Sequence, residues 1–211
     1  MTLKQQITGA LADMRGSSPL IHCITNYVTA GDTANMLLAA GASPIMADDP
    51  SESAEITALA QGLTLNLGTP SGSRVEAMLR SGAEANRRGI PVVFDPVGAG
   101  CSGFRRNSAG EILRRVRLTA IRGNLSEISY LAGFESRENG VDSSETRITA
   151  AEAAQTAAKK LGCVCAVTGE RDVISDGSRT VTILSGTPLL KKVTGAGCMT
   201  SALCAAMCTA A

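Results

Sequence analysis

Apolar residues gather in short runs along the chain, and amphipathic or polar stretches separate these runs. Each run is continuously apolar instead of alternating with polar positions, which is typical of strands that are covered on both faces of a sheet. The predicted strands are residues 20–24, 44–47, 63–67, 91–94, 120–121 and 163–168.

Helical periodicity fills the intervals between these strands. The predicted helices are an N-terminal amphipathic stretch that ends near Gly16, followed by residues 32–40, 52–61, 73–88, 108–115, 126–132 and 150–161. Asp32 is expected as an N-cap with Gly41 beyond the helix end, and Ser73 with Glu76 as a capping box. Strands and helices that take turns predict crossover helices and a parallel sheet.

The alternation of predicted strands and helices changes near the C-terminus. Asp176 and Gly177 stand between two β-prone runs, residues 172–175 and 180–184, which is a hairpin signal. Residues 197–211 form a helical pattern that is apolar all round, so this helix is expected to be buried. The chain is therefore predicted to be one α/β domain over residues 1–211, with a mostly parallel central sheet, helices on both faces and an antiparallel hairpin at one edge.

Composition narrows the functional classes. The 211 residues are 44% hydrophobic and 18% charged, which excludes the disordered class. A net charge of +1 and only 2% aromatic residues argue against a nucleic-acid partner. No apolar run reaches the ~18 residues of a membrane span. Seven cysteines without CxxC spacing, in a chain without a signal peptide, indicate free thiols and a cytoplasmic location.

A glycine-rich stretch, Thr194-Gly195-Ala196-Gly197-Cys198, runs straight into the last predicted helix. Backbone N–H groups at a helix start, without bulky side chains, form an anion site, and the helix dipole adds about half a positive charge. A thiolate at Cys198 is favoured at the same place. The alternatives are a glycine loop that merely turns the chain and a small buried cysteine.

A second glycine-rich stretch, residues 98–103, fits the G-x-G-x-x-G pattern of dinucleotide-binding loops formally. It follows the fourth predicted strand instead of the first, no helix start is expected after it, and no acidic residue lies at the end of a strand about 20 positions on. We therefore predict a flexible loop there.

Ionisable side chains follow several predicted strands. Parallel strands bind ligands at their carboxyl ends, so Asp95, Glu127 and Glu170 are expected at one edge of the sheet. One or two carboxylates with waters suit Mg²⁺ and phosphates, and Arg122 suits a phosphate charge. The alternatives are solvated loop acids, a first-turn helix acid at Glu127 and a surface arginine; the single histidine, His22, is interpreted as a structural strand residue. The residues alone indicate phosphoryl transfer.

Eight motifs in unbroken order resemble the hydroxyethylthiazole kinase family, which belongs to the ribokinase-like superfamily. They are PLIHCITN (19–26), ANMLLAAGASPIM (34–46), NLGT (66–69), DPVGAG (95–100), IRGNLSEI (121–128), GVD (140–142), TGE (168–170) and KVTGAGC (192–198). The resemblance implies a ribokinase-like fold and an enzyme that phosphorylates 4-methyl-5-(2-hydroxyethyl)thiazole with ATP and Mg²⁺ for thiamine salvage.

The resemblance also implies a role for each matching residue. The thiazole pocket is expected to be lined by Asn26, Met46, Gly68, Thr69 and Gly195. ATP is expected to contact Arg122, Thr168 and Thr194, and Mg²⁺ to be held by Asp95 and Glu127. The anion hole for the transferring group is expected from Gly195, Ala196, Gly197 and Cys198, with Cys198 where other ribokinase-like kinases carry an Asp base.

Family members continue through further helices after this glycine-rich helix, so the resemblance implies a domain shortened at its C-terminus. It also implies a homotrimer with active sites at the subunit interfaces. The alternatives are an inactive homologue that binds the thiazole and another ribokinase-like kinase, acting for example on a hydroxymethylpyrimidine. An oxidoreductase built on residues 98–103 is the remotest alternative.

Overall fold

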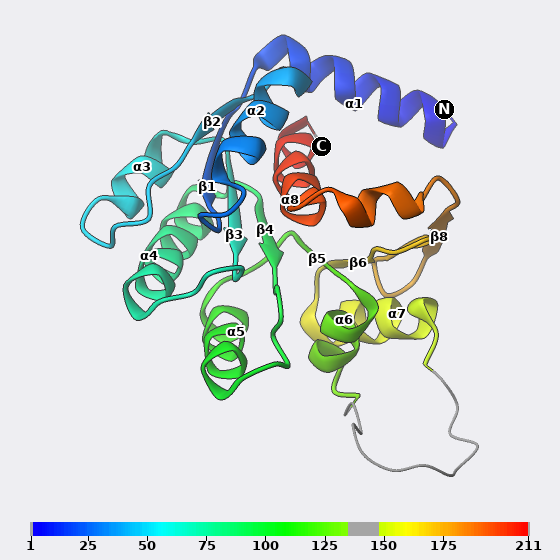
Figure 1. Cartoon of the computed structure of the whole chain (residues 1–211). Helices are drawn as coiled ribbons and strands as arrows, with labels where there is room; N and C mark the ends of the chain where they lie inside the picture. Colours follow the sequence, from blue (N-terminus) through cyan, green and yellow to red (C-terminus); the bar gives the residue numbers. More distant parts are fainter. Residues whose placement is uncertain (1, 135–147, 211) are drawn as a thin grey trace.

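A computed structural model describes residues 2–134 and 148–210, which form an α/β fold around one eight-stranded sheet (Figure 1). The strand order is β2-β1-β3-β4-β5-β6-β7-β8. The strands are β1 Leu20–Ile24, β2 Ser43–Ile45, β3 Gly62–Asn66, β4 Val92–Asp95, β5 Ala120–Gly123, β6 Val164–Val167, β7 Asp172–Ser175 and β8 Thr180–Ile183. Neighbouring strands from β2 to β6 pair in parallel, and β6-β7 and β7-β8 pair antiparallel. The predicted parallel sheet with a hairpin at one edge is confirmed.

Helices cover both faces of the sheet, as predicted. On one face lie α4 (Gly72–Arg88), α5 (Gly103–Arg115), α6 (Leu125–Ala132) and α7 (Ala150–Leu161), with α3 (Ser53–Leu59) packed beside α4. On the other face lie α1 (Leu3–Ser17), α2 (Ala30–Ala40) and α8 (Ala196–Met207) (Figure 1). Two 3₁₀ turns, η1 (Pro188–Lys192) and η2 (Cys208–Ala210), flank α8.

The central strands are covered on both sides. Every residue of β3 and β4 is buried, whereas every residue of the edge strand β8 is exposed. The small residues Ala202, Ala205 and Ala206 of α8 are buried against the sheet, so the expected burial of this helix is confirmed. Within the part of the chain that the structure describes, every helix is too short or too polar to cross a membrane.

Two helix starts differ from the prediction. The N-cap of α2 is Thr29, and Asp32 lies in the first turn. The N-cap of α4 is Ser71, whose hydroxyl accepts from the N–H of Arg74 at 3.2 Å. The predicted capping box of Ser73 and Glu76 was wrong, because the Glu76 carboxylate instead pairs with Arg80 along the exposed side of the helix.

The glycine-rich stretch at residues 98–103 also differs from the prediction. A helix does follow it: α5 begins at Gly103, and the Ser102 hydroxyl caps it by accepting from the N–H of Arg105 at 3.2 Å. The stretch is therefore an ordered strand-to-helix connection. The GVD motif at 140–142 lies outside the described residues.

Candidate functional site

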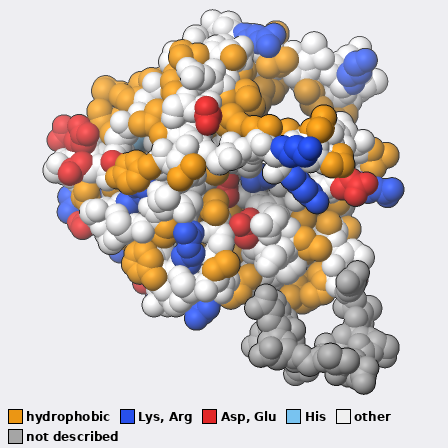
Figure 2. All heavy atoms as spheres, in the orientation of Figure 1, with side chains coloured by type: hydrophobic (Ala, Val, Ile, Leu, Met, Phe, Trp, Pro, Cys, Tyr) orange, Lys and Arg blue, Asp and Glu red, His pale blue; other side chains and the backbone are white. Residues whose placement is uncertain are grey.

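The carboxyl ends of the central strands open into a cavity of about 570 Å³. Charged side chains gather around a hollow beside the segment that leads into α8 (Figure 2). The cavity brings together most of the predicted phosphoryl-transfer residues, namely Asp95, Arg122, Glu127, Thr168, Glu170, Gly195, Ala196, Gly197 and Cys198. Thr194 is exposed and does not line it.

Asp95 ends β4 and is 1% exposed. One carboxylate oxygen, Oδ2, accepts from the Ser201 hydroxyl of α8 at 2.7 Å and lies 3.7 Å from an Arg122 nitrogen. The other, Oδ1, has no hydrogen-bond partner among the described residues. Burial raises the pKa of Asp95 to about 6, although Arg122 and the Ser201 hydrogen bond oppose this rise. Asp95 is thus a buried carboxyl group with one open oxygen.

Glu127 stands opposite, in the first turn of α6. It forms a capping box with Asn124: the Glu127 N–H donates to the Asn124 side chain, and Glu127 Oε2 accepts from the Asn124 N–H at 2.8 Å. Glu127 Oε1 accepts from the N–H of Gly98 at 2.9 Å. The first-turn interpretation of this acid is correct, and the same carboxylate also joins the β4–α5 connection to the cavity wall.

The start of α8 requires its glycines. Gly195 is the N-cap with φ +75°, and a side chain there would meet the Thr29 methyl at 2.2 Å. A side chain at Gly197 would meet the Arg122 guanidinium at 2.4 Å. The first-turn amides of a helix have no intrahelical acceptor, and the N–H of Ala196 donates to the Val193 carbonyl at 3.3 Å. The N–H groups of Gly197 and Cys198 therefore remain free of intrahelical acceptors at the start of α8 beside Arg122.

Two further residues approach this anion site from neighbouring strands. Arg122 of β5 is 16% exposed, and its Nε is buried without a partner in the described chain. Thr168 follows β6, and its hydroxyl donates to the Gly123 carbonyl at 3.3 Å. The cation and the hydroxyl lie on the wall where phosphate charge would sit.

A second group of predicted residues adjoins the cavity through Cys198. The Asn26 side-chain amide donates to Cys198 Sγ at 3.0 Å and to Asn66 Oδ1 at 3.3 Å. The N–H of Gly68 donates to the same Asn66 oxygen at 2.8 Å. A side chain at Gly68 would meet Asn26 at 2.6 Å, so this close approach requires glycine. Asn26, Gly68 and Cys198 are thus brought together from residues far apart in the sequence.

Thr69 lies at the outer side of this group, and its hydroxyl accepts from the N–H of Tyr27 at 3.3 Å. Met46 follows β2 and does not line the 570 Å³ cavity. His22 is structural, as predicted: its Nε2 donates to the Ala47 carbonyl at 2.7 Å, and Nδ1 lies 2.8 Å from the Thr57 hydroxyl. Burial lowers the pKa of His22, so the ring is neutral and fixes the segment that carries Met46.

Three residues of the site were missed by the sequence reasoning, namely Arg74, Arg105 and Ser201, and Asn66 was noted only within the NLGT motif, without a role. Arg105 donates to the carbonyls of Val97 at 2.6 Å and Gly68 at 2.8 Å, and so joins two of the site's loops. Asn66 ends β3 beside Asp95, so it obeys the rule that ligands bind at the carboxyl ends of parallel strands, on which the other predictions were based. The two arginines and Ser201 lie on helices, each at helical spacing from buried residues of the same helix, so the period places them on the inward face. A charged or polar residue on that face is not itself a signal of a functional role.

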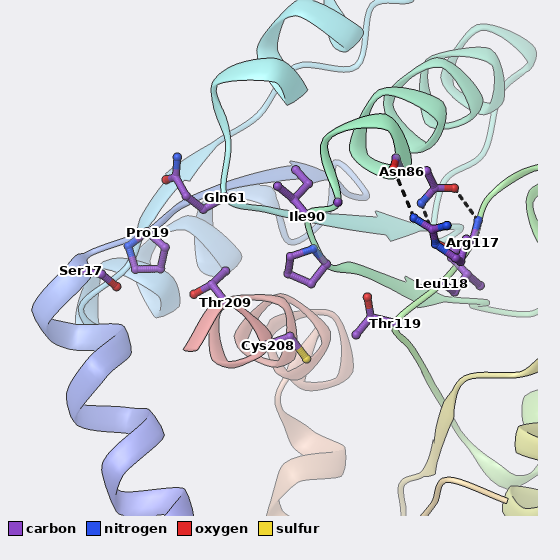
Figure 3. Close-up of a pocket in the computed structure, with 12 residues that line it drawn as sticks. Ser17, Pro19, Gln61, Asn86, Ile90, Arg117, Leu118, Thr119, Cys208 and Thr209 are labelled. Carbon is purple, nitrogen blue, oxygen red and sulfur yellow. Dashed lines mark hydrogen bonds between the residues drawn. The ribbon is translucent and has the colours of Figure 1, made fainter. Parts of the chain in front are cut away.

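A separate cavity of about 680 Å³ lies at the opposite, amino edge of the sheet (Figure 3). Its principal polar groups already bind each other: the Asn86 side chain donates to the Arg117 carbonyl at 2.8 Å and accepts from the Arg117 N–H at 2.7 Å. The carboxyl edge, with its unpaired buried groups, is the better candidate for chemistry.

Comparison with known proteins points to one family. Residues 11–211 match the model of the hydroxyethylthiazole kinase family. The hydroxyethylthiazole kinase of Ruminiclostridium cellulolyticum is 52% identical over 209 residues, which cover 98% of this chain and 77% of that protein.

Solved structures point to the same family. The hydroxyethylthiazole kinase of Pyrococcus horikoshii OT3 superposes with a TM-score of 0.88 at 40% identity, over 97% of this chain and 77% of that one. The adenosine kinase of Sinorhizobium meliloti, 15% identical, has a TM-score of 0.58 over 96% of this chain and 70% of that one, and shares the fold alone. The ribokinase-like α/β architecture is confirmed.

Proposed function

The chain belongs to the hydroxyethylthiazole kinase family, and from this premise we propose how its carboxyl-edge cavity performs the reaction. The terminal phosphoryl group of ATP passes to the hydroxyl of 4-methyl-5-(2-hydroxyethyl)thiazole, a step of thiamine salvage. The hydroxyl oxygen forms a bond to the γ-phosphorus, the bond to the bridging oxygen breaks, and ADP leaves. The observation that carries this proposal is the hydrogen bond from Asn26 to Cys198. It joins the loops that carry Asn26, Gly68 and Thr69 to the anion site at the start of α8.

On the nucleotide side we assign Arg122, Thr168 and Thr194. Arg122 supplies a fixed positive charge to the transferring phosphoryl group. The Thr168 hydroxyl would donate to a phosphate oxygen after turning away from the Gly123 carbonyl, to which it now donates at 3.3 Å. The amides of Gly197 and Cys198 receive the equatorial oxygens, with Gly195 and Ala196 shaping the turn before them.

On the acceptor side we assign Asn26, Met46, Gly68 and Thr69 to the thiazole ring, with Gly195 near the hydroxyethyl group. Cys198 positions the hydroxyl and, as the thiolate that a helix N-terminus favours, takes its proton as a weak base and becomes the thiol. Phosphoryl transfer depends mostly on positioning and charge stabilisation, so a cysteine is sufficient where an Asp is not present.

We propose that Mg²⁺ accompanies ATP and that Asp95 and Glu127 hold it, directly or through water. The residues fit such an ion, because Asp95 Oδ1 is a buried acceptor without a partner in the described chain. Over residues 2–134 and 148–210 no three His, Cys, Asp or Glu side chains gather into a metal-holding group, and two carboxylates are enough for Mg²⁺ with phosphates and waters. When bound, the ion would neutralise charge on the phosphates.

We also propose a homotrimer and a cytoplasmic location. The trimer is supported by the exposed apolar side chains Tyr27 and Val28, which follow Asn26 in an acceptor loop, and Leu38 on α2, since a second copy would cover them. Light scattering that shows only monomer would reject it. The cytoplasm is supported by the seven cysteines, all of which are free thiols in the structure.

The decisive experiment is ADP release from ATP and Mg²⁺ by this chain, with and without hydroxyethylthiazole. Thiazole-dependent release supports the proposal. Thiazole binding in calorimetry without ADP release selects an inactive binding protein instead, and release that depends on another alcohol, such as a hydroxymethylpyrimidine, selects a different small-molecule kinase.

A further inference from the structure

Arg74 is a cation buried at the start of α4, with only 2% of its surface exposed. A buried guanidinium is costly, and a buried ion pair is weak evidence for stability, since apolar residues of similar volume often serve the fold as well. The contacts of Arg74 therefore call for a reason beyond packing.

Each contact that the Arg74 guanidinium makes ends on a loop at the carboxyl edge of the sheet. Nε and Nη2 donate to Asp48 Oδ2 at 3.0 and 2.6 Å. Nη1 donates to the carbonyl and the hydroxyl of Thr69 at 2.7 and 2.5 Å. The guanidinium carbon lies 3.7 Å from the centre of the Tyr27 ring, which covers it while remaining 73% exposed itself.

These three loops are the ones that carry the proposed acceptor residues. Tyr27 follows Asn26, Asp48 is two residues beyond Met46, and Thr69 follows Gly68. The loops come after three different strands, β1, β2 and β3, so no local interaction sets their relative positions. One planar group with donors in fixed directions does so.

We propose that Arg74 is a positioning residue that sets the thiazole pocket by holding these three loops in register. The inference rests on the proposed function, which places the thiazole between them. Arg74 contacts neither the cavity nor the phosphoryl-transfer residues, so it acts on the acceptor and not on ATP.

Arg74 also determines how the Thr69 hydroxyl is used. A hydroxyl has two acceptor sites and one hydrogen. Arg74 Nη1 and the N–H of Tyr27 occupy the two acceptor sites, so the Thr69 hydrogen is left to donate. A ligand that meets Thr69 must then present an acceptor, as a neutral thiazole does with its ring nitrogen.

The test compares Arg74→Met with the control Arg87→Met, both in the 211-residue chain. Arg87 lies on the same helix in an exposed pair with Glu84 and touches none of the three loops. Arg74→Met is expected to weaken the Kd and KM for hydroxyethylthiazole by about 10- to 100-fold, because small misplacements at a site have effects of this size. The KM for ATP is expected to be unchanged, and Arg87→Met to behave like the parent.

Conservative variants separate positioning from a loss of folding. Arg74→Lys keeps the charge toward Asp48 but cannot reach both loops in the same plane, so its Kd for thiazole is expected between parent and Arg74→Met. Asp48→Asn, which leaves Arg74 in place, is expected to give a smaller change in the same direction. If Arg74 acts through Thr69, Thr69→Val combined with Arg74→Met weakens binding less than the two separate effects multiplied.

Two results overturn the assignment while leaving the proposed function intact: folded Arg74→Met that binds thiazole as the parent does, or a weakening that is equal for thiazole and ATP. A parent chain that binds no thiazole overturns the proposed function itself, and the pocket role of Arg74 with it. Calorimetry on parent and variants in parallel distinguishes these outcomes.

Discussion

Replacing Asp95 by Asn is expected to stabilise the fold above pH 6 while stopping phosphoryl transfer. Burial raises the pKa of this carboxyl from 3.8 to about 6 in the folded chain, against the opposition of Arg122 and Ser201. The folded state therefore holds the proton more tightly than the unfolded state does. A pKa difference of this size corresponds to about 3 kcal/mol of unfolding free energy at a pH well above 6.

The direction of the pH dependence follows from the linkage between proton binding and folding. The stability contributed by the neutral carboxyl is fully present below pH 3.8 and is lost as the pH rises through about 6. Asn carries no charge at any pH and is close to Asp in size. The advantage of Asp95→Asn should therefore be small near pH 4, grow between pH 4 and 6, and be constant above about pH 7. The gain of about 3 kcal/mol in unfolding free energy is an upper value, because Asp95→Asn would leave the Arg122 guanidinium without a carboxylate partner.

Urea unfolding followed by far-UV circular dichroism between pH 4.5 and 8 measures this difference; the chain has no Trp, so tryptophan fluorescence does not serve. Asp13→Asn, which removes an exposed charge on α1, controls for the change in net charge. An advantage of Asp95→Asn that is the same at pH 5 and pH 8, or a parent that is the more stable protein at pH 8, would refute the reasoning. The same variant should still bind hydroxyethylthiazole in calorimetry but release no ADP.

Four further substitutions, at three residues, test the anion site. Cys198→Asp should keep or raise the rate of ADP release, and Cys198→Ala should lower it modestly, whereas complete loss in a folded, thiazole-binding Asp variant contradicts the weak-base role. Gly195→Ala should lower the thermal midpoint, because φ is +75° and a Cβ would lie 2.2 Å from the Thr29 methyl; an unchanged midpoint would show that α8 shifts freely. Arg122→Met should raise the KM for ATP with little change in thiazole Kd, and steady-state kinetics with each substrate varied in turn checks this.

The sheet was predictable because burial imposes a simple pattern. Strands such as β3 and β4 are covered on both faces, so each appears as an unbroken apolar run. Chemistry at the ends of such strands follows from topology, which is why Asp95, Arg122 and Thr168 were placed correctly at one edge. The glycines before α8 were found for a local reason, since they stand directly at a helix start.

Helix starts were less predictable because several residues compete for one cap. Ser71 and Ser73 both suit an N-cap, and only the path of the chain after β3 selects Ser71. Thr29 begins α2 without capping it: its φ and ψ of −128° and 14° lie outside the extended region usual for an N-cap, and its hydroxyl is directed to the Asn26 side chain, to which it donates at 3.0 Å. Asn26 is one of the site residues. Thr29 therefore holds a site side chain in place and does not cap its own helix.

Arg74 shows most clearly what the sequence does not predict about the site. In the sequence it is one of several arginines in a polar helix, and Arg80 and Arg87 nearby form the exposed pairs expected of them. Its inward orientation depends on Asp48, Thr69 and Tyr27, which arrive from three other parts of the chain. Its spacing from Met78 and Ala85 places Arg74 on the buried face of the helix, but the period does not identify its partners, because these are set by which loops meet at the sheet edge.

The same edge explains why polar groups are left unpaired inside a well-packed chain. Five buried side-chain atoms of the described residues have no hydrogen-bond partner, and three of them lie at this site: Asp95 Oδ1, Asn66 Nδ2 and Arg122 Nε. Each such group costs about 1–3 kcal/mol relative to a paired one, so their concentration at one place opposes folding. Arg122 and Asp95 still face each other at 3.7 Å, but the acceptor, the amide donor and the guanidinium N–H that lack hydrogen bonds suit a ligand that carries both charge and hydrogen-bonding groups. The destabilisation expected from ionised Asp95 is then a consequence of the site's design for its ligands, and it should diminish when ATP and the thiazole are bound.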